Sequence, residues 1–120
     1  MPVQISVVIP AYNAADFLRN CLGNLRLSTA PFECIVVDDG STDGTLEIIK
    51  AYDGKVRWDS HENMGEARTV NKGFSMARGE IIGVVNSDDP LLPGAISTIV
   101  EHLLARPDAL VAYPDWLWID

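Results

Sequence analysis

Short apolar runs alternate along this chain with segments whose apolar residues recur every three or four positions. Three of the runs are rich in β-branched residues and are continuous, which is typical of parallel strands covered on both faces. They are Ile5 to Ile9, Cys34 to Val37 and Ile81 to Val85. Weaker runs at Lys55 to Trp58 and Leu110 to Tyr113 predict two further strands. The alternation predicts a doubly wound, mostly parallel α/β sheet of Rossmann type, in one domain over residues 1–120.

Between these runs, the helical spacing of apolar residues predicts four helices. The second helix is expected to use Ser41 and Thr42 as capping residues, with Asp43 in its first turn. The third helix is expected to run from about Gly65 to Ala77 and to stop at Gly79, which suits the position just after a helix. Its expected buried face consists of Ala67, Val70, Phe74 and Ala77.

Two acidic pairs follow predicted strands: Asp38-Asp39 follows the second, and Asp88-Asp89 comes shortly after the fourth. The carboxyl ends of parallel strands meet at one edge of a sheet, which is where such folds bind ligands. Adjacent carboxylates repel each other in a partly buried rim unless a cation or a hydrogen-bond donor compensates. A hard divalent cation held by one or two carboxylates, and completed by substrate phosphates, would do so. The sequence therefore predicts a divalent cation at Asp88 and Asp89, near Asp39.

Other interpretations of the segment from Asp38 to Gly44 are available. Taken alone, it could be a polar turn with a helix cap. A calcium loop fits its first half, but Lys50 stands where that loop needs a bidentate Glu, and a strand precedes it. A dinucleotide site is disfavoured because Pro10 to Asn13, after the first strand, is not a glycine-rich turn.

The charge balance restricts the partners of the chain. Its 17 acidic and 9 basic side chains give a formal net charge of −8, which repels nucleic acid and anionic lipid. We therefore expect no nucleic-acid partner. No apolar run approaches the roughly 20 residues of a membrane span, so no membrane span is expected. The chain starts at Met1 without a leader, and it has two cysteines. These features predict a reduced cytoplasmic protein. A longer protein containing it could be peripheral to a membrane.

Four motifs, in order, resemble those of the family 2 glycosyltransferases of the GT-A fold. They are Ile5 to Asn13, Val36 to Thr45, Asn63 to Glu80, and Ser87 to Asp89 followed by Pro93. The resemblance runs along nearly the whole chain. It implies a nucleotide-sugar-binding domain of an enzyme that transfers a sugar from a nucleoside-diphosphate sugar, of the UDP type, to an acceptor hydroxyl.

The resemblance also implies roles for single residues in binding the nucleotide. The loop Pro10-Ala11-Tyr12 would cradle the nucleotide, with Tyr12 beside the base. Asp39 would accept a hydrogen bond from the base imide, which favours uracil-like bases over cytosine. Arg68 would add positive charge near the nucleotide, although a solvated helix face explains this residue equally well.

The last motif corresponds to the family's metal-binding "DxD" region. Asp88 would contact the ribose or the metal, and Asp89 would hold Mg²⁺ or Mn²⁺ against the diphosphate. Asn86 stands where many relatives have an Asp. The family's domain continues past residue 120 with the acceptor pocket and the general base. The chain is therefore expected to be an incomplete domain that binds the donor without transferring the sugar, and to form a homo-oligomer through its C-terminal segment.

Two other classes of protein remain open at this point. A receiver-like signalling or interaction module has a similar sheet, but it carries an acidic pair after the first strand and a phosphate-accepting Asp after the third. This chain has Pro10-Ala11 and Ser60-His61-Glu62 at those positions. A purely structural α/β fragment without a ligand is the other alternative.

Overall fold

The computed structural model describes residues 5–26, 32–88, 95–109 and 111. Their elements, in chain order, are β1 (Ile5–Ala11), α1 (Ala15–Arg26), β2 (Glu33–Asp39), α2 (Thr45–Ala51), β3 (Arg57–His61), α3 (Glu66–Met76), β4 (Ile81–Val84) and α4 (Ala95–Leu104). Asp89 lies outside the described residues, as does the expected strand at Leu110 to Tyr113 apart from Val111, which is exposed and not in a strand. The C-terminal segment expected to mediate oligomerisation lies outside them as well.

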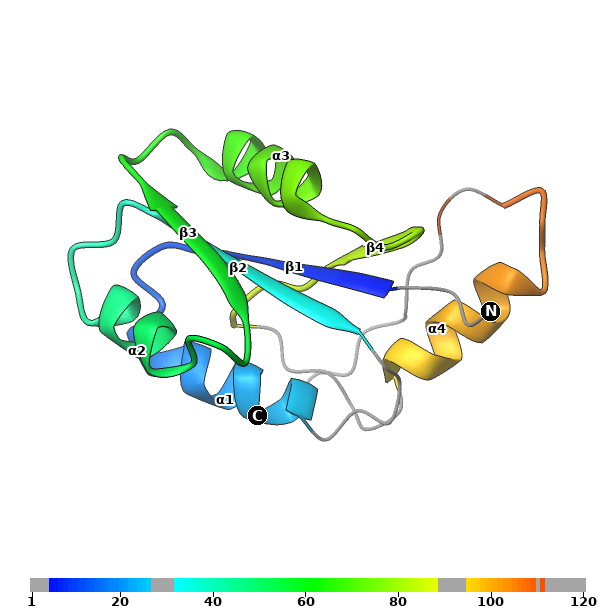
Figure 1. Cartoon of the computed structure of the whole chain (residues 1–120), viewed down its shortest axis with the longest axis horizontal. Helices are drawn as coiled ribbons and strands as arrows, with labels where there is room; N and C mark the ends of the chain where they lie inside the picture. Colours follow the sequence, from blue (N-terminus) through cyan, green and yellow to red (C-terminus); the bar gives the residue numbers. More distant parts are fainter. Residues whose placement is uncertain (1–4, 27–31, 89–94, 110, 112–120) are drawn as a thin grey trace.

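The described strands form one parallel sheet in the order β3-β2-β1-β4. Helix α3 covers one face of this sheet, while α1 and α2 cover the other (Figure 1). This arrangement confirms the predicted doubly wound parallel α/β fold. The chain builds β1, β2 and β3 outward in one direction and then returns to place β4 on the other side of β1. The carboxyl edge next to β1 is therefore the topological switch point, where open α/β sheets bind ligands.

Strands β1 and β2 extend further than the apolar runs predicted. Parallel pairing continues through Ala11 opposite Asp38 and through Asp39 opposite His61. The first acidic pair therefore ends β2 instead of following it. Pro10 fits within β1 because pairing with β4 stops at Val8, so a residue without a backbone N–H interrupts no ladder on that side.

Strand β4 is less covered than expected. Its residues alternate between half-buried and exposed, and Val84 is 47% exposed. The prediction that this run is covered on both faces is wrong, because α3 packs over β1 and β2 and leaves β4 at the edge of the described sheet. The continuous pattern holds for β1 and β2, which are the two inner strands.

Helix α3 turns a different face to the sheet than its apolar spacing predicted. Thr69 and Gly73 are its buried residues, whereas Ala67 is exposed and Phe74 is 41% exposed. The reason is a close approach to the sheet: a Cβ at Gly73 would collide with the side chain of Val8 in β1. The residue one turn earlier, Thr69, is turned toward the sheet with it.

The end of α3 is fixed by polar contacts at the amino edge of the sheet. The helix ends at Met76 with Ala77 as its C-cap, which is close to the expected end at Ala77. The N–H of Gly79 donates to Ser6 Oγ at 2.8 Å, and the N–H of Arg78 donates to Glu33 Oε2 at 2.6 Å. Arg57 Nη1 donates to both Glu33 Oε1, at 2.8 Å, and the Met76 carbonyl, at 2.6 Å. These bonds tie the connection between α3 and β4 to the first three strands.

No helix within the described ranges is long and apolar enough to cross a lipid bilayer.

Candidate functional site

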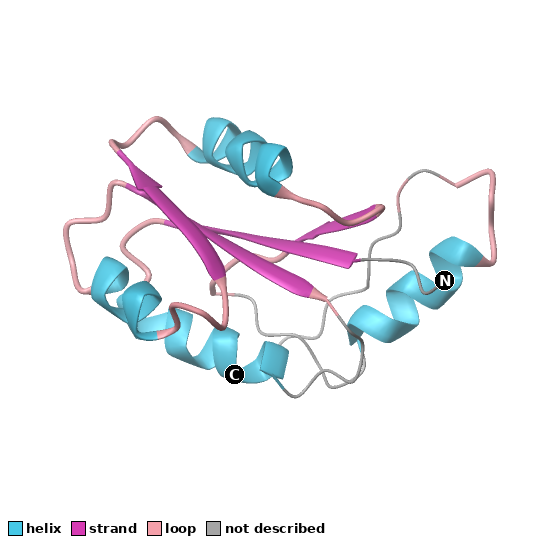
Figure 2. Ribbon diagram, in the orientation of Figure 1, coloured by secondary structure: helices cyan, strands magenta, loops and turns pink. Residues whose placement is uncertain are grey.

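The loops that follow β1, β2 and β3 gather at the carboxyl edge of the sheet, seen at the left in Figure 2. The predicted site residues come from these loops and from the strand ends beside them. Some of these side chains are already hydrogen-bonded within the fold, which limits the hydrogen bonds they can make to a ligand.

The loop after β1 is bonded to the loop after β2. Asn13 adopts a positive φ of 47°, which asparagine tolerates better than most residues. Its side-chain Oδ1 accepts the N–H of Thr42 at 2.8 Å, and its own N–H donates to Ser41 Oγ at 2.9 Å. The N–H of Ala14 donates to Thr45 Oγ1 at 2.9 Å. Ser41 and Thr42 therefore join two loops.

The predicted capping of α2 by Ser41 and Thr42 is wrong. The N-cap of this helix is Gly44, and Asp43 precedes the helix instead of lying in its first turn. Asp43 Oδ1 accepts both the N–H of Thr45, at 2.9 Å, and its hydroxyl, at 2.5 Å. These hydrogen bonds, led by the one from the Thr45 hydroxyl, hold the pKa of Asp43 below its usual range.

Asp38 is fully buried and bonded within the fold. Its Oδ1 accepts the N–H of Ser41 at 3.3 Å, and its Oδ2 accepts the hydroxyl of Ser60 at 2.8 Å. Oδ2 therefore joins β2 to β3, and Oδ1 joins β2 to the loop that follows it.

Asp39 is the charged group on which the site centres. It is 4% exposed. Its Oδ1 accepts the backbone N–H of Met64 at 2.8 Å and lies 3.1 Å from His61 Nε2. Within the described residues, its Oδ2 has one hydrogen-bond contact, with Asn63 Nδ2 at 3.2 Å. Burial raises the pKa of Asp39, but the hydrogen bond from the Met64 N–H and the contact with His61 help to outweigh burial, so the pKa lies below its usual range and the carboxylate is charged at neutral pH.

Gly40 allows the loop after β3 to reach this carboxylate. Its φ is +70°, and a Cβ at this position would collide with the backbone of Asn63. Only glycine meets both conditions without strain. The contact brings Asn63 and Met64 onto Asp39, so the glycine of the Asp38-Asp39-Gly40 motif shapes the site directly.

The other predicted nucleotide-binding residues take different positions. Tyr12 is 52% exposed beside the end of β1, while Pro10 is half-buried and Ala11 is buried. The side chain of Ala11 points into the core, so this residue can reach a ligand through its backbone alone. Arg68, in the first turn of α3, is exposed and makes no ion pair within the described part of the chain.

The expected metal ligands are described in part. Asp88 is exposed, beyond the end of β4. The Cys21 thiol of α1 lies 4.0 Å from the carbonyl oxygen of Asn86, so the segment just before Asp88 lies on the α1 side of the edge. Burial, and then the charge of Asp88, raise the pKa of this thiol to about 11. Among the described residues, no three His, Cys, Asp or Glu side chains cluster closely enough to hold a metal ion. One exposed carboxylate fits only a cation whose other ligands are phosphate oxygens and water.

Sequence reasoning missed three residues of the network around Asp39, namely His61, Asn63 and Thr69. The signal that could have found His61 is its place at the end of a strand beside the acidic pair. Its pairing with Asp39 depends on the register of β2 against β3, which short polar runs do not determine.

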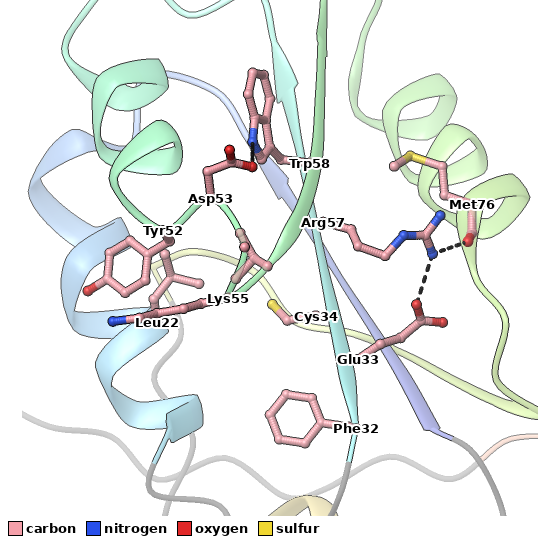
Figure 3. A pocket seen from close by; sticks show the side chains of 12 residues that line it. Leu22, Phe32, Glu33, Cys34, Tyr52, Asp53, Lys55, Arg57, Trp58 and Met76 are labelled. Carbon is pink, nitrogen blue, oxygen red and sulfur yellow. Dashed lines mark hydrogen bonds and ion pairs between the residues drawn. The ribbon is translucent and has the colours of Figure 1, made fainter.

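A separate hollow of about 1020 Å³ opens at the opposite edge of the sheet (Figure 3). It lies at the amino ends of β2 and β3 and is lined by residues that include Phe32, Cys34, Tyr52, Val56 and Arg57. Asp39 ends β2 at the other edge, so this hollow is not part of the candidate site.

Comparison with known proteins gives a consistent result. The model of the family described as Glycosyl transferase family 2 matches residues 6–115. Glycosyltransferase GlyG of Streptococcus pneumoniae serotype 4 is 40% identical over 108 residues, which are 86% of this chain and 36% of that protein.

Two solved structures share the fold. The crystal structure of S. aureus TarS in complex with UDP-GlcNAc has a TM-score of 0.76 at 29% identity, covering 87% of this chain and 32% of that one. The mannosyltransferase PcManGT from Pyrobaculum calidifontis, in complex with GDP-Man and Mn²⁺, also has a TM-score of 0.76, at 25% identity, covering 86% and 33%. The chain thus spans about a third of the length of GlyG and of each of these two crystallised chains, the first of which is TarS 1-349.

Proposed function

Because the chain belongs to glycosyl transferase family 2, we propose that its carboxyl edge binds the nucleoside diphosphate of a sugar donor, as part of an enzyme that transfers the sugar to an acceptor hydroxyl. The observation that carries this proposal is Asp39, a buried carboxylate held in its charged form at the carboxyl edge of the sheet. Family membership favours this function over a receiver-like module.

The base is recognised by Asp39. Among the residues that the structure describes, two donors occupy its Oδ1, whereas Oδ2 has a single contact at 3.2 Å and so keeps capacity to accept another hydrogen bond. Uracil presents an N–H at ring position 3, and cytosine presents a bare nitrogen there. A carboxylate oxygen attracts the first and repels the second. The exposed ring of Tyr12 lies next to this base.

The diphosphate is bound where positive charge can be gathered. In a chain with a net charge of −8, an anionic ligand requires a cation. We assign a divalent ion, Mn²⁺ or Mg²⁺, to Asp88 and Asp89 together with the diphosphate oxygens. Support comes from the exposed carboxylate of Asp88 and from the Mn²⁺ in the complex of the related mannosyltransferase. Arg68 supplies further positive charge.

These groups support transfer by stabilising the leaving group. A divalent cation held by Asp88 and Asp89 would supply electrostatic stabilisation to the leaving nucleoside diphosphate. Asp39 and Tyr12 hold the base, and so fix where the diphosphate lies. A carboxylate must also remove the proton of the acceptor hydroxyl, and we assign no described residue to that step.

Calorimetry with UDP and CDP, each with and without Mn²⁺, tests the proposal. We expect weak binding of UDP that strengthens at least tenfold with Mn²⁺, because the ion offsets repulsion between the diphosphate and the acidic edge. CDP should bind more weakly under both conditions. Equal affinity with and without Mn²⁺ would remove the metal from the proposal, and absence of binding would overturn it.

A further inference from the structure

His61 is bonded directly to the carboxylate that reads the base. It is the last residue of β3 and pairs in register with Asp39. Its Nε2 lies 3.1 Å from Asp39 Oδ1 and 3.2 Å from Thr69 Oγ1, and its side chain is 13% exposed. The ring therefore bridges β2 and α3 behind the carboxylate.

The neighbours of Nε2 determine which ring nitrogen carries the hydrogen. Ionised Asp39 can only accept. The hydroxyl of Thr69 directs its hydrogen to an acceptor, the Gly65 carbonyl at 2.8 Å, so toward His61 its oxygen accepts as well. Nε2 is therefore the donor. The other nitrogen, Nδ1, is buried and has no hydrogen-bond partner among the described residues, so the ring acts on its surroundings through Nε2.

We propose that His61 is a positioning residue for base recognition: its Nε2–H, together with the N–H of Met64, fixes Asp39 Oδ1 and so keeps Oδ2 directed at the base. This inference rests on the function proposed above. A carboxylate held by two donors on one oxygen cannot rotate freely. Without His61, the described contacts that remain are the N–H of Met64 on Oδ1 and Asn63 Nδ2 on Oδ2, so the direction of Oδ2 is fixed less firmly.

This role predicts an effect on the choice of base and not on binding in general. A donor that holds Asp39 in place contributes to the hydrogen bond from uracil. It contributes nothing to contacts with ribose or diphosphate, which UDP and CDP share. The quantity to measure is therefore the ratio of the two dissociation constants.

The variants are His61→Leu, which removes the donor, and His61→Gln, whose amide can restore one. His102→Leu is the matched control, because His102 is exposed on α4. In calorimetry with Mn²⁺, we expect His61→Leu to lower the preference for UDP over CDP about tenfold, the size of one hydrogen bond to a charged group. His61→Gln should recover most of the preference. His102→Leu should leave it unchanged.

Two results would overturn the inference. One is a His61→Leu variant that keeps the preference for UDP. The other is an equal loss of affinity for both nucleotides, which would indicate that His61 only supports the fold. A wild-type chain that binds UDP and CDP equally would instead overturn base recognition by Asp39.

A measurement on the unliganded wild-type chain separates these failures and does not depend on any variant folding. The ¹⁵N spectrum of the imidazole rings is expected to show the hydrogen of His61 on Nε2, in slow exchange with water. A hydrogen on Nδ1, with Nε2 bare, would overturn the positioning role of His61 while leaving the proposed function in place.

Discussion

Gly73 of α3 and Val8 of β1 approach each other so closely that the glycine has no room for a Cβ. This contact seats the helix on the sheet, and the first turn of the same helix brings Thr69 to His61. The packing of one glycine is thus connected to the geometry of the candidate site.

Gly73→Ala should destabilise the fold. Overpacking against Val8 costs about 1–3 kcal/mol, and the gain in helix propensity of about 1 kcal/mol offsets only part of this. Gly23→Ala is the control, because Gly23 lies in α1 with open space around its Cβ position, and it should leave stability unchanged or raise it. Urea denaturation of both variants measures the difference. Equal stabilisation by both would contradict the close packing of α3.

Acid should destabilise the chain in part through Glu33. Burial raises the pKa of this group, but hydrogen bonds from Ser6, Arg78 and Arg57 outweigh burial and lower it. Its contribution to the free energy of unfolding is therefore complete above the unfolded pKa of about 4.3. That contribution is lost as the pH falls through the lower, folded pKa.

The variant Glu33→Gln removes this pH-dependent contribution. It should be less stable than wild type by about 1–3 kcal/mol at pH 7, and its free energy of unfolding should fall less steeply below pH 5. Glu101→Gln, at an exposed position of α4, should follow the wild-type curve. The free energy of unfolding is measured by urea titration from pH 7 to pH 3. If it changes with pH in the same way for wild type and Glu33→Gln, the ionisation of Glu33 is not linked to folding.

The two thiols should be inert in the folded chain. Burial, with a smaller effect of Asp88, raises the pKa of Cys21 to about 11, and burial, with a smaller effect of Cys21, raises that of Cys34 to about 12. The thiolate is the reactive form. A disulfide reagent at pH 7 is expected to modify neither thiol in buffer and both in denaturant. Rapid modification of the native chain would contradict the burial of both cysteines.

Asp39→Asn should reverse the preference of the site for the base. Two N–H donors surround Oδ1, so the amide oxygen takes that position and the NH₂ group takes the position of Oδ2. This group repels the imide N–H of uracil and donates to the bare ring nitrogen of cytosine. Affinity for UDP should fall by about 1–3 kcal/mol, and affinity for CDP should rise.

Asp38→Asn is the matched control for this change. Asp38 Oδ2 meets the hydroxyl of Ser60, which can accept from an amide as well as donate to a carboxylate. Nucleotide affinity should therefore stay near that of wild type. Calorimetry on both variants, with circular dichroism to check the fold, decides the matter, and equal losses would show that Asp39 does not read the base.

The sequence was sufficient to predict the parallel sheet. The continuous runs around Val8 and Val36 identify inner strands because both of their faces are buried. The acidic residues that end the second run mark the carboxyl edge. The limits of these strands were missed, because Pro10 and Asp38 lack strand propensity and are held in the ladder by tertiary pairing.

The surroundings of Asp39 could not be predicted from local pattern. His61 and Met64 reach it through the register of β3 and through the close approach that Gly40 permits. Each of these two contacts joins Asp39 to a residue more than 20 positions away in sequence. The buried face of α3 was predicted wrongly for a similar reason, because contact through Gly73 outweighs the apolar stripe of Val70 and Phe74.

The position at which a uridine nucleotide binds is measured most directly by amide chemical shifts during titration of the ¹⁵N-labelled chain with UDP and Mg²⁺. The predicted result is a set of saturable shifts at Tyr12, which follows β1, at Gly40, which follows Asp39, and at Met64, whose N–H is bonded to Asp39. Shifts confined to Phe32, Tyr52 and Val56, around the hollow at the opposite edge, would contradict binding at the carboxyl edge, and so would the absence of any shift.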